Sequence, residues 1–232
     1  MKQVVIIFGQ PGAGKGAQSE LLAEKLGYYH LESSKVIENC FKRENSEKIF
    51  EIDGKEYKVA DEKVLWQTGF LNSPPFVVNL MTERFTQLFK EDDNLILSGS
   101  PRTLFEAEKE IPVLEKLYGK ENIKVVFLEI SAETTLWRNS KRKICDLMRH
   151  SIIFNPETEH LTMCPLDGSA LKKREKLDDP ETIKVRLKEF AERTAPIIDF
   201  YEKQGIKVSK INGESTIAEV HSQVMKAIGQ EV

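Results

Sequence analysis

The chain has 232 residues, of which 40% are hydrophobic and 31% charged, with a formal net charge of −3. This balance is typical of a globular protein with a sizeable core, and the acidic charge argues against a sequence-independent nucleic-acid binder. No apolar run reaches the ~18 residues of a membrane span, and three cysteines, an odd number, imply no disulfide framework. We therefore expect a cytoplasmic protein that binds neither nucleic acid nor membrane.

Short apolar runs alternate with helical patterns along the chain, as in a parallel sheet with crossover helices. The first run is too short for the hydrophobic region of a signal peptide, and we expect it to be the first strand of a mature protein. The predicted strands are Val4–Phe8, Tyr28–Leu31, Leu95–Leu97, Val125–Ile130 and Ile206–Ile211. The predicted helices are Lys15–Leu26, a helix starting at Pro74 with Ser73 as its cap, Thr103–Tyr118, Ala132–Arg142, a long helix from Asp179 to about Gly205, and a last helix with a capping box of Thr216 and Glu219. The sequence therefore predicts an α/β fold with a five-stranded parallel sheet flanked by helices.

Two stretches interrupt this alternation. Within residues 44–63, the segment Phe50–Val59 is predicted to form a hairpin on an Asp-Gly type I′ turn, with Phe50 opposite Tyr57 and Val59 on the same apolar side. Residues 143–177 are polar and rich in turn-forming residues. Both stretches are predicted to be insertions between a strand and a helix of the core.

Residues Gly9 to Lys15 match the phosphate-loop pattern G-x-x-x-x-G-K and lie between a predicted strand and a predicted helix. Glycines allow consecutive backbone N–H groups to surround a polyphosphate, and the helix N-terminus adds a favourable dipole. Lys15 supplies a mobile positive charge for the β- and γ-phosphate oxygens. The next residue is Gly16 instead of Ser or Thr, so the hydroxyl that usually binds magnesium is missing there. The motif predicts ATP binding.

The run from Gly9 to Gly16 resembles adenylate kinases and the related UMP/CMP kinases, which share a glycine after the lysine. The resemblance continues in order through Gly99–Thr103, Arg138 and Arg142, Asp178-Asp179 with Thr182 and Arg186, and Lys210–Gly213. It covers essentially the whole chain and implies the P-loop NTPase fold with an acceptor-binding arm and a lid. The implied single kinase chain has a core of residues 1–32, 92–142 and 178–232, an arm at about 33–91 with a hairpin at about 49–59, and a lid at about 143–177.

The resemblance implies transfer of the γ-phosphate of ATP to a nucleoside monophosphate, most simply AMP, with Mg²⁺ bound to ATP. The implied ATP-binding residues are Gly12, Ala13, Gly14, Lys15, Gly16, Ala17, Arg138, Arg142 and Lys210. The implied residues for the monophosphate are Ser33, Phe70, Asn72, Gly99, Arg102, Glu106, Lys176 and Arg186. Among these, Lys15, Arg102, Arg142 and Arg186 are implied to be catalytic, with Asp178 and Asp179 orienting arginines. We expect the chain to work as a monomer.

Several departures from the family pattern fall on the acceptor side. Ser98 replaces an aspartate that normally orders magnesium-bound water, and Glu38 replaces an arginine. Lys35 or Lys42 are candidates to restore the positive charge that Glu38 removes. A third arginine is replaced by Lys176, which keeps the charge but loses the bidentate fork; Arg174 is a possible substitute.

Glu106 stands where the family usually has a glutamine that reads the acceptor base. A carboxylate cannot donate a hydrogen bond to adenine N1 unless it is protonated, whereas it suits the N1–H and N2–H₂ edge of guanine. Besides AMP, the sequence therefore leaves GMP, CMP and UMP open as acceptors. It also leaves open a nucleotide-binding protein with little turnover, while a kinase for a non-nucleotide acceptor is disfavoured.

The lid resembles the metal-stapled form of the family, with Cys145, Met148, Cys164 and Asp167 at the four ligand positions. Two thiolates and a carboxylate are reasonable zinc ligands, but a methionine thioether is a poor one. His150 or His160 could complete the site. The alternatives are a lid with structural zinc and a metal-free, hydrogen-bonded lid.

Overall fold

The computed structural model describes residues 2–148, 151–152, 158–173 and 178–231. Its central sheet is entirely parallel and has the strand order β10-β6-β1-β5-β2. The strands are β1 (Val4–Gly9), β2 (Tyr29–Glu32), β5 (Leu95–Ser98), β6 (Ile123–Glu129) and β10 (Val208–Asn212). All five predicted strands are confirmed, and β10 starts slightly later than the apolar run suggested.

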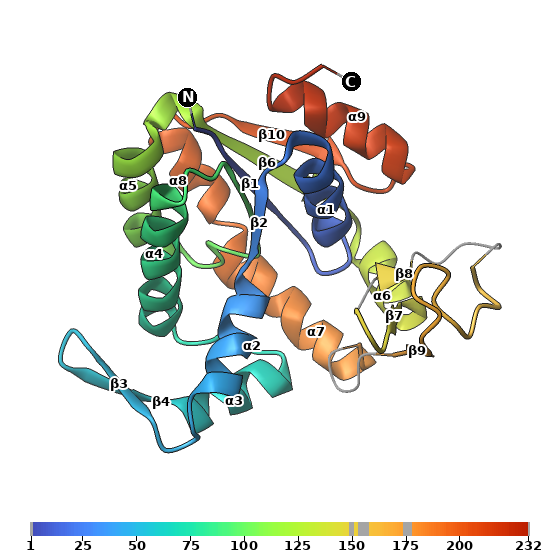
Figure 1. Cartoon of the computed structure of the whole chain (residues 1–232), viewed down its shortest axis with the longest axis horizontal. Coiled ribbons are helices and arrows are strands. Elements are labelled where there is room, and N and C mark those ends of the chain that lie inside the picture. Colours follow the sequence, from blue (N-terminus) through green and yellow to red (C-terminus); the bar gives the residue numbers. More distant parts are fainter. Residues whose placement is uncertain (1, 149–150, 153–157, 174–177, 232) are drawn as a thin grey trace.

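Helices cover both faces of this sheet (Figure 1). On one face lie α1 (Lys15–Leu26) and α9 (Ile217–Ala227), and on the other lie α4 (Pro74–Lys90), α5 (Leu104–Tyr118) and α8 (Ile197–Lys203). Successive side chains of a strand point to opposite faces. In β1, Val5 and Ile7 therefore pack toward α1 and α9, while Ile6 and Phe8 enter the other core. Two apolar cores hold β1 in place, and its carboxyl end leads directly into the phosphate loop.

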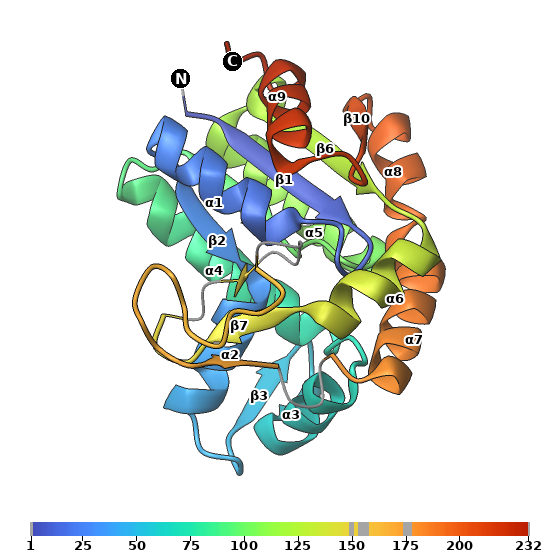
Figure 2. The same ribbon diagram turned by 90° about the vertical axis from the view of Figure 1, so that its right-hand side faces the viewer.

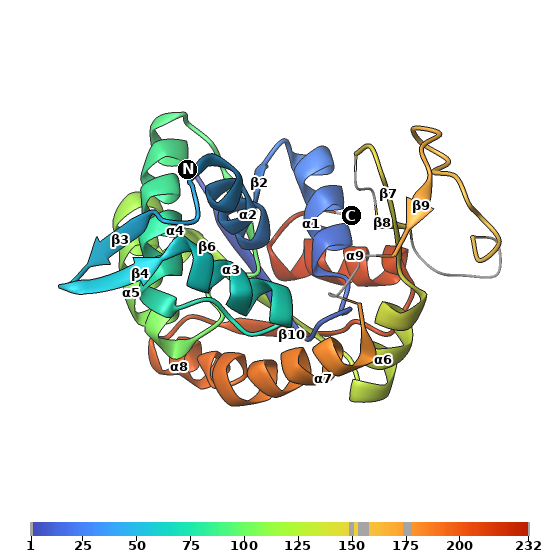
Figure 3. The same cartoon turned by 90° about the horizontal axis from the view of Figure 1, so that it is seen from below.

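The two insertions extend from opposite ends of the molecule (Figure 3). One contains α2 (Ser33–Arg43), the hairpin strands β3 (Ile49–Ile52) and β4 (Lys55–Lys58), and α3 (Val59–Thr68). The other follows α6 (Ala132–Lys141) and contains a small antiparallel sheet of β7 (Lys143–Cys145), β8 (Ser151–Ile152) and β9 (Leu171–Lys172). A short 3-10 turn, Lys120–Asn122, precedes β6.

The hairpin is confirmed with the predicted register, in which Phe50 pairs with Tyr57. Its turn residues Asp53 and Gly54 both have positive φ angles, 52° and 72°, as a type I′ turn requires. The placement of Val59 on this hairpin was wrong, because Val59 begins α3, a helix that the apolar pattern did not reveal.

The long helix predicted after Asp179 is in fact interrupted. The structure has α7 (Pro180–Glu189), a π-helical turn Phe190–Thr194, and then α8. Pro196 has no N–H to continue the helical hydrogen bonds, so the regular helix cannot run through it. Asp179 caps α7 by accepting from the N–H groups of Glu181 and Thr182.

Other helix ends test the predicted caps. The capping box of Thr216 and Glu219 is confirmed at α9. Ser73 precedes α4 as predicted, but its side chain makes no capping hydrogen bond; its backbone N–H instead donates to Glu62 at 2.9 Å. None of the described helices has the length and apolar character needed to cross a bilayer.

Candidate active site

The phosphate loop is a tight backbone turn between β1 and α1 at the carboxyl edge of the sheet (Figure 2). A Cβ atom on Gly9 would lie 2.2 Å from the carbonyl oxygen of Leu128 on the neighbouring strand. Gly12 has a φ angle of 84°, and a Cβ atom there would lie 2.7 Å from the side-chain nitrogen of Asn139. Only glycine fits at these two positions, so the spacing of the motif follows from backbone packing.

Lys15 is half-buried over this loop. Its ammonium group donates hydrogen bonds to the carbonyl oxygens of Gly9 at 2.8 Å and Gln10 at 2.9 Å. Burial lowers the pKa of Lys15 well below its usual value, and the positive charges of Arg102, Arg186 and Arg142 lower it further. Lys15 therefore lies within electrostatic range of the three arginines that the family resemblance implied to be catalytic.

These cations come from separate elements. Arg102 lies in the turn between β5 and α5, Arg142 directly follows α6, and Arg186 lies on α7. Such a cluster of positive charge is unfavourable by itself, but it suits the crowded oxygens of two phosphate chains. Since these residues come from distant parts of the chain, their proximity to Lys15 depends on the tertiary fold.

The turn between β5 and α5 is built around Gly99. A Cβ atom on Gly99 would lie 2.6 Å from the guanidinium of Arg102 and 2.8 Å from the hydroxyl of Ser33. The Ser33 hydroxyl donates to the carbonyl of Gly99 at 2.6 Å, and Thr194 donates to the carbonyl of Arg102 at 2.7 Å. The Arg102 side chain thus lies against the backbone at the carboxyl end of β5.

Two carboxyl groups on α5 lie behind this turn. Glu106 is only 2% exposed and accepts from the backbone N–H of Arg102 at 2.7 Å and from the hydroxyl of Thr103 at 3.0 Å. One turn further, Glu110 is fully buried, and its two carboxyl oxygens lie 2.8 and 2.9 Å from the hydroxyl of Ser100. Burial raises the pKa of Glu106 and raises that of Glu110 well above its usual value.

Glu110 escaped the sequence reasoning. The sequence did contain a signal. Glu110 follows Glu106 by one helical turn and therefore lies on the same buried side of α5, where a glutamate is unusual.

Ser98, which replaces the expected aspartate, is paired with a histidine. The Nε2 atom of His30 on β2 lies 2.7 Å from the Ser98 hydroxyl. Burial lowers the pKa of His30 to about 4, so the imidazole is neutral at pH 7. The sequence gave no motif-level signal for His30, because the contact depends on the pairing of β2 with β5.

Arg138 joins the phosphate loop to the loop that follows β10. Its guanidinium donates to the carbonyl of Gly213 at 2.9 Å and to that of Gly12 at 3.3 Å. A Cβ atom on Gly213 would lie 3.2 Å from the carbonyl of Ala13. Lys210 is exposed on β10, the edge strand of the sheet, so the contact with the phosphate loop is made by Gly213 instead.

The arm approaches the core at the end of α3. A Cβ atom on Gly69 would lie 3.4 Å from the side chain of Arg186, which shows close contact between this loop and α7. Phe70 is 48% exposed. The Asn72 side chain is buried and donates to the backbone carbonyl and the carboxylate of Glu62 at 2.7 and 2.9 Å, so within the arm its amide is already bonded.

The two lysines considered as substitutes for a missing arginine are both ion-paired on α2. Lys35 lies 3.3 Å from Glu32, and Lys42 lies 3.2 Å from Glu38. The predicted Lys176 and its possible substitute Arg174 lie outside the described residues.

Comparison with known proteins agrees with this geometry. The sequence model described as adenylate kinase matches residues 7–206. The chain belongs to the adenylate kinase family. An adenylate kinase of Caldicellulosiruptor bescii is 33% identical over 231 residues, covering 98% of this chain and 99% of the relative. Adenylate kinases of Thermotoga maritima (31% identical, 99% and 98% covered) and Bacillus subtilis (29% identical, 97% of each covered) are similar over their full lengths.

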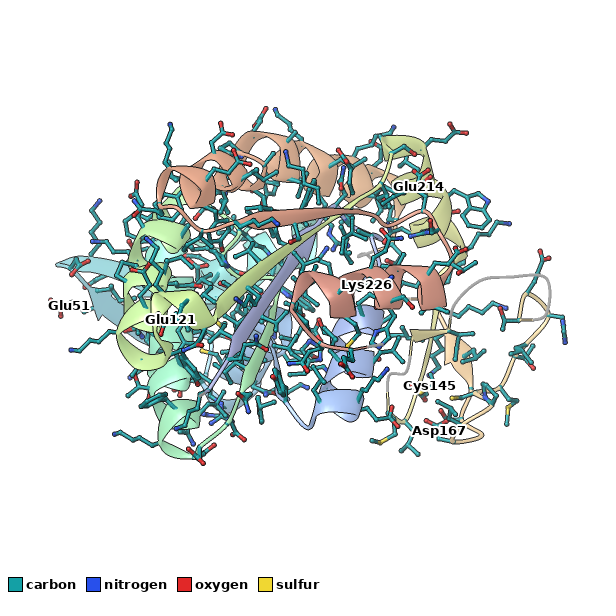
Figure 4. All side chains as sticks on the ribbon, turned by 90° about the horizontal axis from the view of Figure 1, so that it is seen from above. Glu51, Glu121, Cys145, Asp167, Glu214 and Lys226 are labelled. Atoms are coloured by element: carbon teal, nitrogen blue, oxygen red, sulfur yellow. The ribbon has the colours of Figure 1, made fainter. Side chains whose placement is uncertain are left out.

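In this member of the adenylate kinase family, three of the proposed lid ligands lie together. The ligand atoms of Cys145, Cys164 and Asp167 lie within 4.8 Å of one another, and the Cys145 thiol donates to Asp167 at 3.0 Å. Cys145 and Asp167 lie in the lid, away from the core sheet (Figure 4). Met148 is 65% exposed, so its thioether points to solvent. His160 is exposed, and His150 lies outside the described residues.

Proposed function

We propose that this chain transfers the γ-phosphate of ATP to AMP and so forms two molecules of ADP. The observation that carries the proposal is the cluster of Lys15, Arg102, Arg142 and Arg186 at the mouth of a phosphate loop. Phosphoryl transfer between nucleotides depends mainly on positioning and on charge stabilisation. Four cations from four elements supply both.

On the donor side, the backbone of Gly12–Ala17 binds the phosphates of ATP, which arrives with Mg²⁺. Lys15 leaves the two carbonyls that now accept its hydrogen bonds and moves to the phosphate oxygens. Arg142 approaches the transferring group. Arg138 lies next to the adenine, supported by its bonds to Gly12 and Gly213, and we assign Lys210 to the outer edge of the same pocket.

On the acceptor side, Arg102 holds the phosphate of AMP through its two-pronged guanidinium, with Ser33 and Gly99 shaping the turn. Arg186 reaches both the acceptor and the transferring phosphate. Phe70 and the backbone at Asn72 line the base, and we assign Lys176, which lies outside the described residues, to the phosphate by resemblance alone.

Glu106 fits AMP if its carboxyl group is protonated. Its pKa is raised by burial, which favours the neutral acid. A neutral carboxyl group has one O–H donor and one carbonyl acceptor, the same pattern as a glutamine amide. This pattern matches N1 and the amino group of adenine. To read adenine in this way, the two oxygens of Glu106 must leave the Arg102 N–H and the Thr103 hydroxyl, from which they now accept.

We also propose that the two insertions close over the bound nucleotides. The arm, residues 33–91, carries the acceptor, and the lid, residues 143–177, covers ATP. Closure brings Arg142 inward and excludes water, which limits hydrolysis of ATP.

The lid group fits a structural zinc ion. Cys145, Cys164 and Asp167 offer two sulfur ligands and one oxygen ligand close together, and zinc accepts both kinds. The hydrogen bond from the Cys145 thiol is the main reason why the pKa of Asp167 is lowered, so the carboxylate is ionised and ready to bind a cation. Zinc bound there would crosslink the end of β7 to the turn that contains Asp167.

Metal analysis of protein purified without a histidine tag tests the zinc. We expect about one zinc per chain, as for a closed structural site, lost in a Cys145→Ser, Cys164→Ser double variant. Cys40→Ser is the matched control, because Cys40 is also a buried free cysteine but lies on α2. If the wild-type protein contains clearly less than one zinc per chain, the zinc proposal is refuted and the metal-free, hydrogen-bonded lid is favoured.

A coupled assay that offers AMP, GMP, CMP and UMP with Mg·ATP tests the reaction. We expect ADP formation with AMP at a rate well above that with the other three. A preference for GMP would mean that Glu106 acts as an ionised acceptor. Absence of turnover with all four, combined with normal ATP binding, would favour a nucleotide-binding protein.

A further inference from the structure

Two groups that commonly hold the magnesium ion of bound ATP are missing from the expected positions. In P-loop enzymes these are a Ser or Thr hydroxyl after the loop lysine and an aspartate at the end of a neighbouring strand. Here the positions are occupied by Gly16 and Ser98. Crowding does not explain the first, because a Cβ atom on Gly16 would meet no atom within 4 Å. The hydroxyl of Ser98 already pairs with His30.

A carboxylate lies on the next strand at the same level. Ile7 on β1 is in register with Ser98 on β5, and Ser98 is in register with Glu32 on β2. The phosphate loop starts directly after β1, so Glu32 lies at the edge of the sheet where the phosphates of ATP must bind. Its side chain is 31% exposed, which leaves the carboxylate accessible to water.

The negative charge of Glu32 acts on the positive charges of Lys15 and Arg102. Burial lowers the pKa of Lys15 and that of Arg102, and the negative charge of Glu32 acts in the opposite direction on both, so the carboxylate lies within electrostatic range of each. One oxygen accepts from the hydroxyl of Ser34, and the other lies 3.3 Å from the ammonium group of Lys35. Burial acts to raise the pKa of Glu32, but the Ser34 hydrogen bond and the nearby positive charge outweigh it and leave the pKa below its usual value. Glu32 is therefore ionised at neutral pH.

We propose that Glu32 is the carboxylate that binds the water shell of the magnesium ion entering with ATP, from the strand beside the one that usually carries it. Magnesium keeps several of its waters in such sites and needs only one or two carboxylates besides the substrate phosphates. The proposal rests on the proposed function, because it assigns a residue to Mg·ATP in that reaction. It also explains why a serine at position 98 is compatible with turnover.

A purely structural role makes a different prediction. If Glu32 only supports Arg102 or the start of α2, its removal changes binding of ATP by a similar factor with and without magnesium. If Glu32 binds the hydrated ion, its removal weakens Mg·ATP binding alone. Metal-free ATP carries more negative charge, so loss of a nearby carboxylate leaves its binding unchanged or makes it tighter.

The experiment is titration calorimetry of the full chain with ATP, once with excess Mg²⁺ and once with EDTA. We expect Glu32→Gln to raise the Kd of Mg·ATP by about tenfold, the effect of losing a hydrogen bond to a charged group, with no increase in EDTA. Glu47→Gln is the matched control: it removes one carboxylate from an exposed pair with Lys58 on the arm. Equal changes under both conditions, or no change in either, overturn the proposal.

A second test moves the carboxylate from position 32 to position 98, where the family usually has its aspartate. A Glu32→Gln, Ser98→Asp double variant places an acid at the register partner, and we expect it to recover most of the Mg·ATP affinity. Failure to recover, with an intact fold by circular dichroism, contradicts the proposal. If Glu32→Gln does not fold, Glu32→Asp serves instead, with a smaller loss that again must be confined to Mg·ATP. Absence of ADP formation by the wild-type chain would refute the proposed function alone, since this binding measurement needs no turnover.

Discussion

The phosphate loop and the acceptor-side turn at residues 98–106 lie at the same edge of one sheet, but their cations are held by different partners. In the loop, Lys15 and Arg138 donate to backbone carbonyls. In the turn, Arg102 lies in the field of the carboxyl groups of Glu106 and Glu32. Backbone carbonyls keep their dipoles at every pH, whereas carboxyl groups titrate and can be replaced. The cations of the phosphate loop are therefore held by main-chain geometry, whereas the surroundings of Arg102 depend on side chains that can change.

The largest expected effect concerns the donor side. Lys15→Met should lower the rate of ADP formation by about 10³-fold, the upper range for loss of one charge-stabilising donor. The pKa of Lys15 is lowered because its charge is buried beside three arginines, so its removal relieves repulsion. The melting temperature of the ligand-free protein should then not fall. A coupled assay and a thermal melt check both, and activity within tenfold of wild type would contradict the assignment.

Arg102→Lys tests the acceptor side, with the next largest effect. Lysine keeps the charge but loses the fork, so kcat/KM for AMP should fall by about 100-fold, while KM for ATP stays within about twofold. Arg84→Lys is a suitable control, because Arg84 lies on α4, where its guanidinium donates to the hydroxyl of Tyr29 at 3.0 Å. A comparable rise in KM for both nucleotides would show that the two sides are not separate.

A pH experiment tests the claim that the acceptor side titrates. Burial raises the pKa of Glu110, so the folded protein keeps a proton that the unfolded chain releases above its ordinary pKa of 4.5. The stability of the wild type should therefore decrease as the pH rises above that value. Glu110→Gln retains an acceptor for Ser100 and does not ionise.

We expect Glu110→Gln to raise the melting temperature at pH 7.5 by about 2–4 °C, the shift that roughly 1 kcal/mol gives in a chain of this size. The gain should disappear near pH 4.5. Glu108→Gln, on the exposed side of the same helix, should show no such dependence. A gain of equal size at both pH values would mean that packing, and not ionisation, is responsible.

The smallest effect is expected on the arm. Glu38→Gln breaks the ion pair with Lys42, which spans one helical turn and is partly exposed. Its loss should cost about 0.3–0.5 kcal/mol in the free energy of unfolding. Urea denaturation measures it, and the difference should vanish at about 1 M salt, where exposed charges are screened. A larger, salt-independent loss would show that Glu38 belongs to the buried network around the acceptor.

Local patterns allowed a good part of this fold to be predicted. The two-residue Asp-Gly turn determined the register of the hairpin, and the spacing of Thr216 and Glu219 determined a helix start. The misses have two causes. Helix α3 depends on packing against other elements, which a short sequence window does not contain. The break before α8 had a local signal, Pro196, which the predicted long helix did not take into account.

The spacing of the glycines and the lysine was enough to predict the phosphate loop and the family, because the backbone requires glycine at Gly9 and Gly12. No side chain fits at these two positions, so their requirement for glycine appears directly in the spacing of glycines along the motif. The contacts of the buried titratable groups near Ser98, Ser100 and Arg102 could be found only in the tertiary structure. His30, Glu32 and Glu110 reach the site through strand pairing and burial, and long-range contacts of this kind leave no fixed spacing in the sequence.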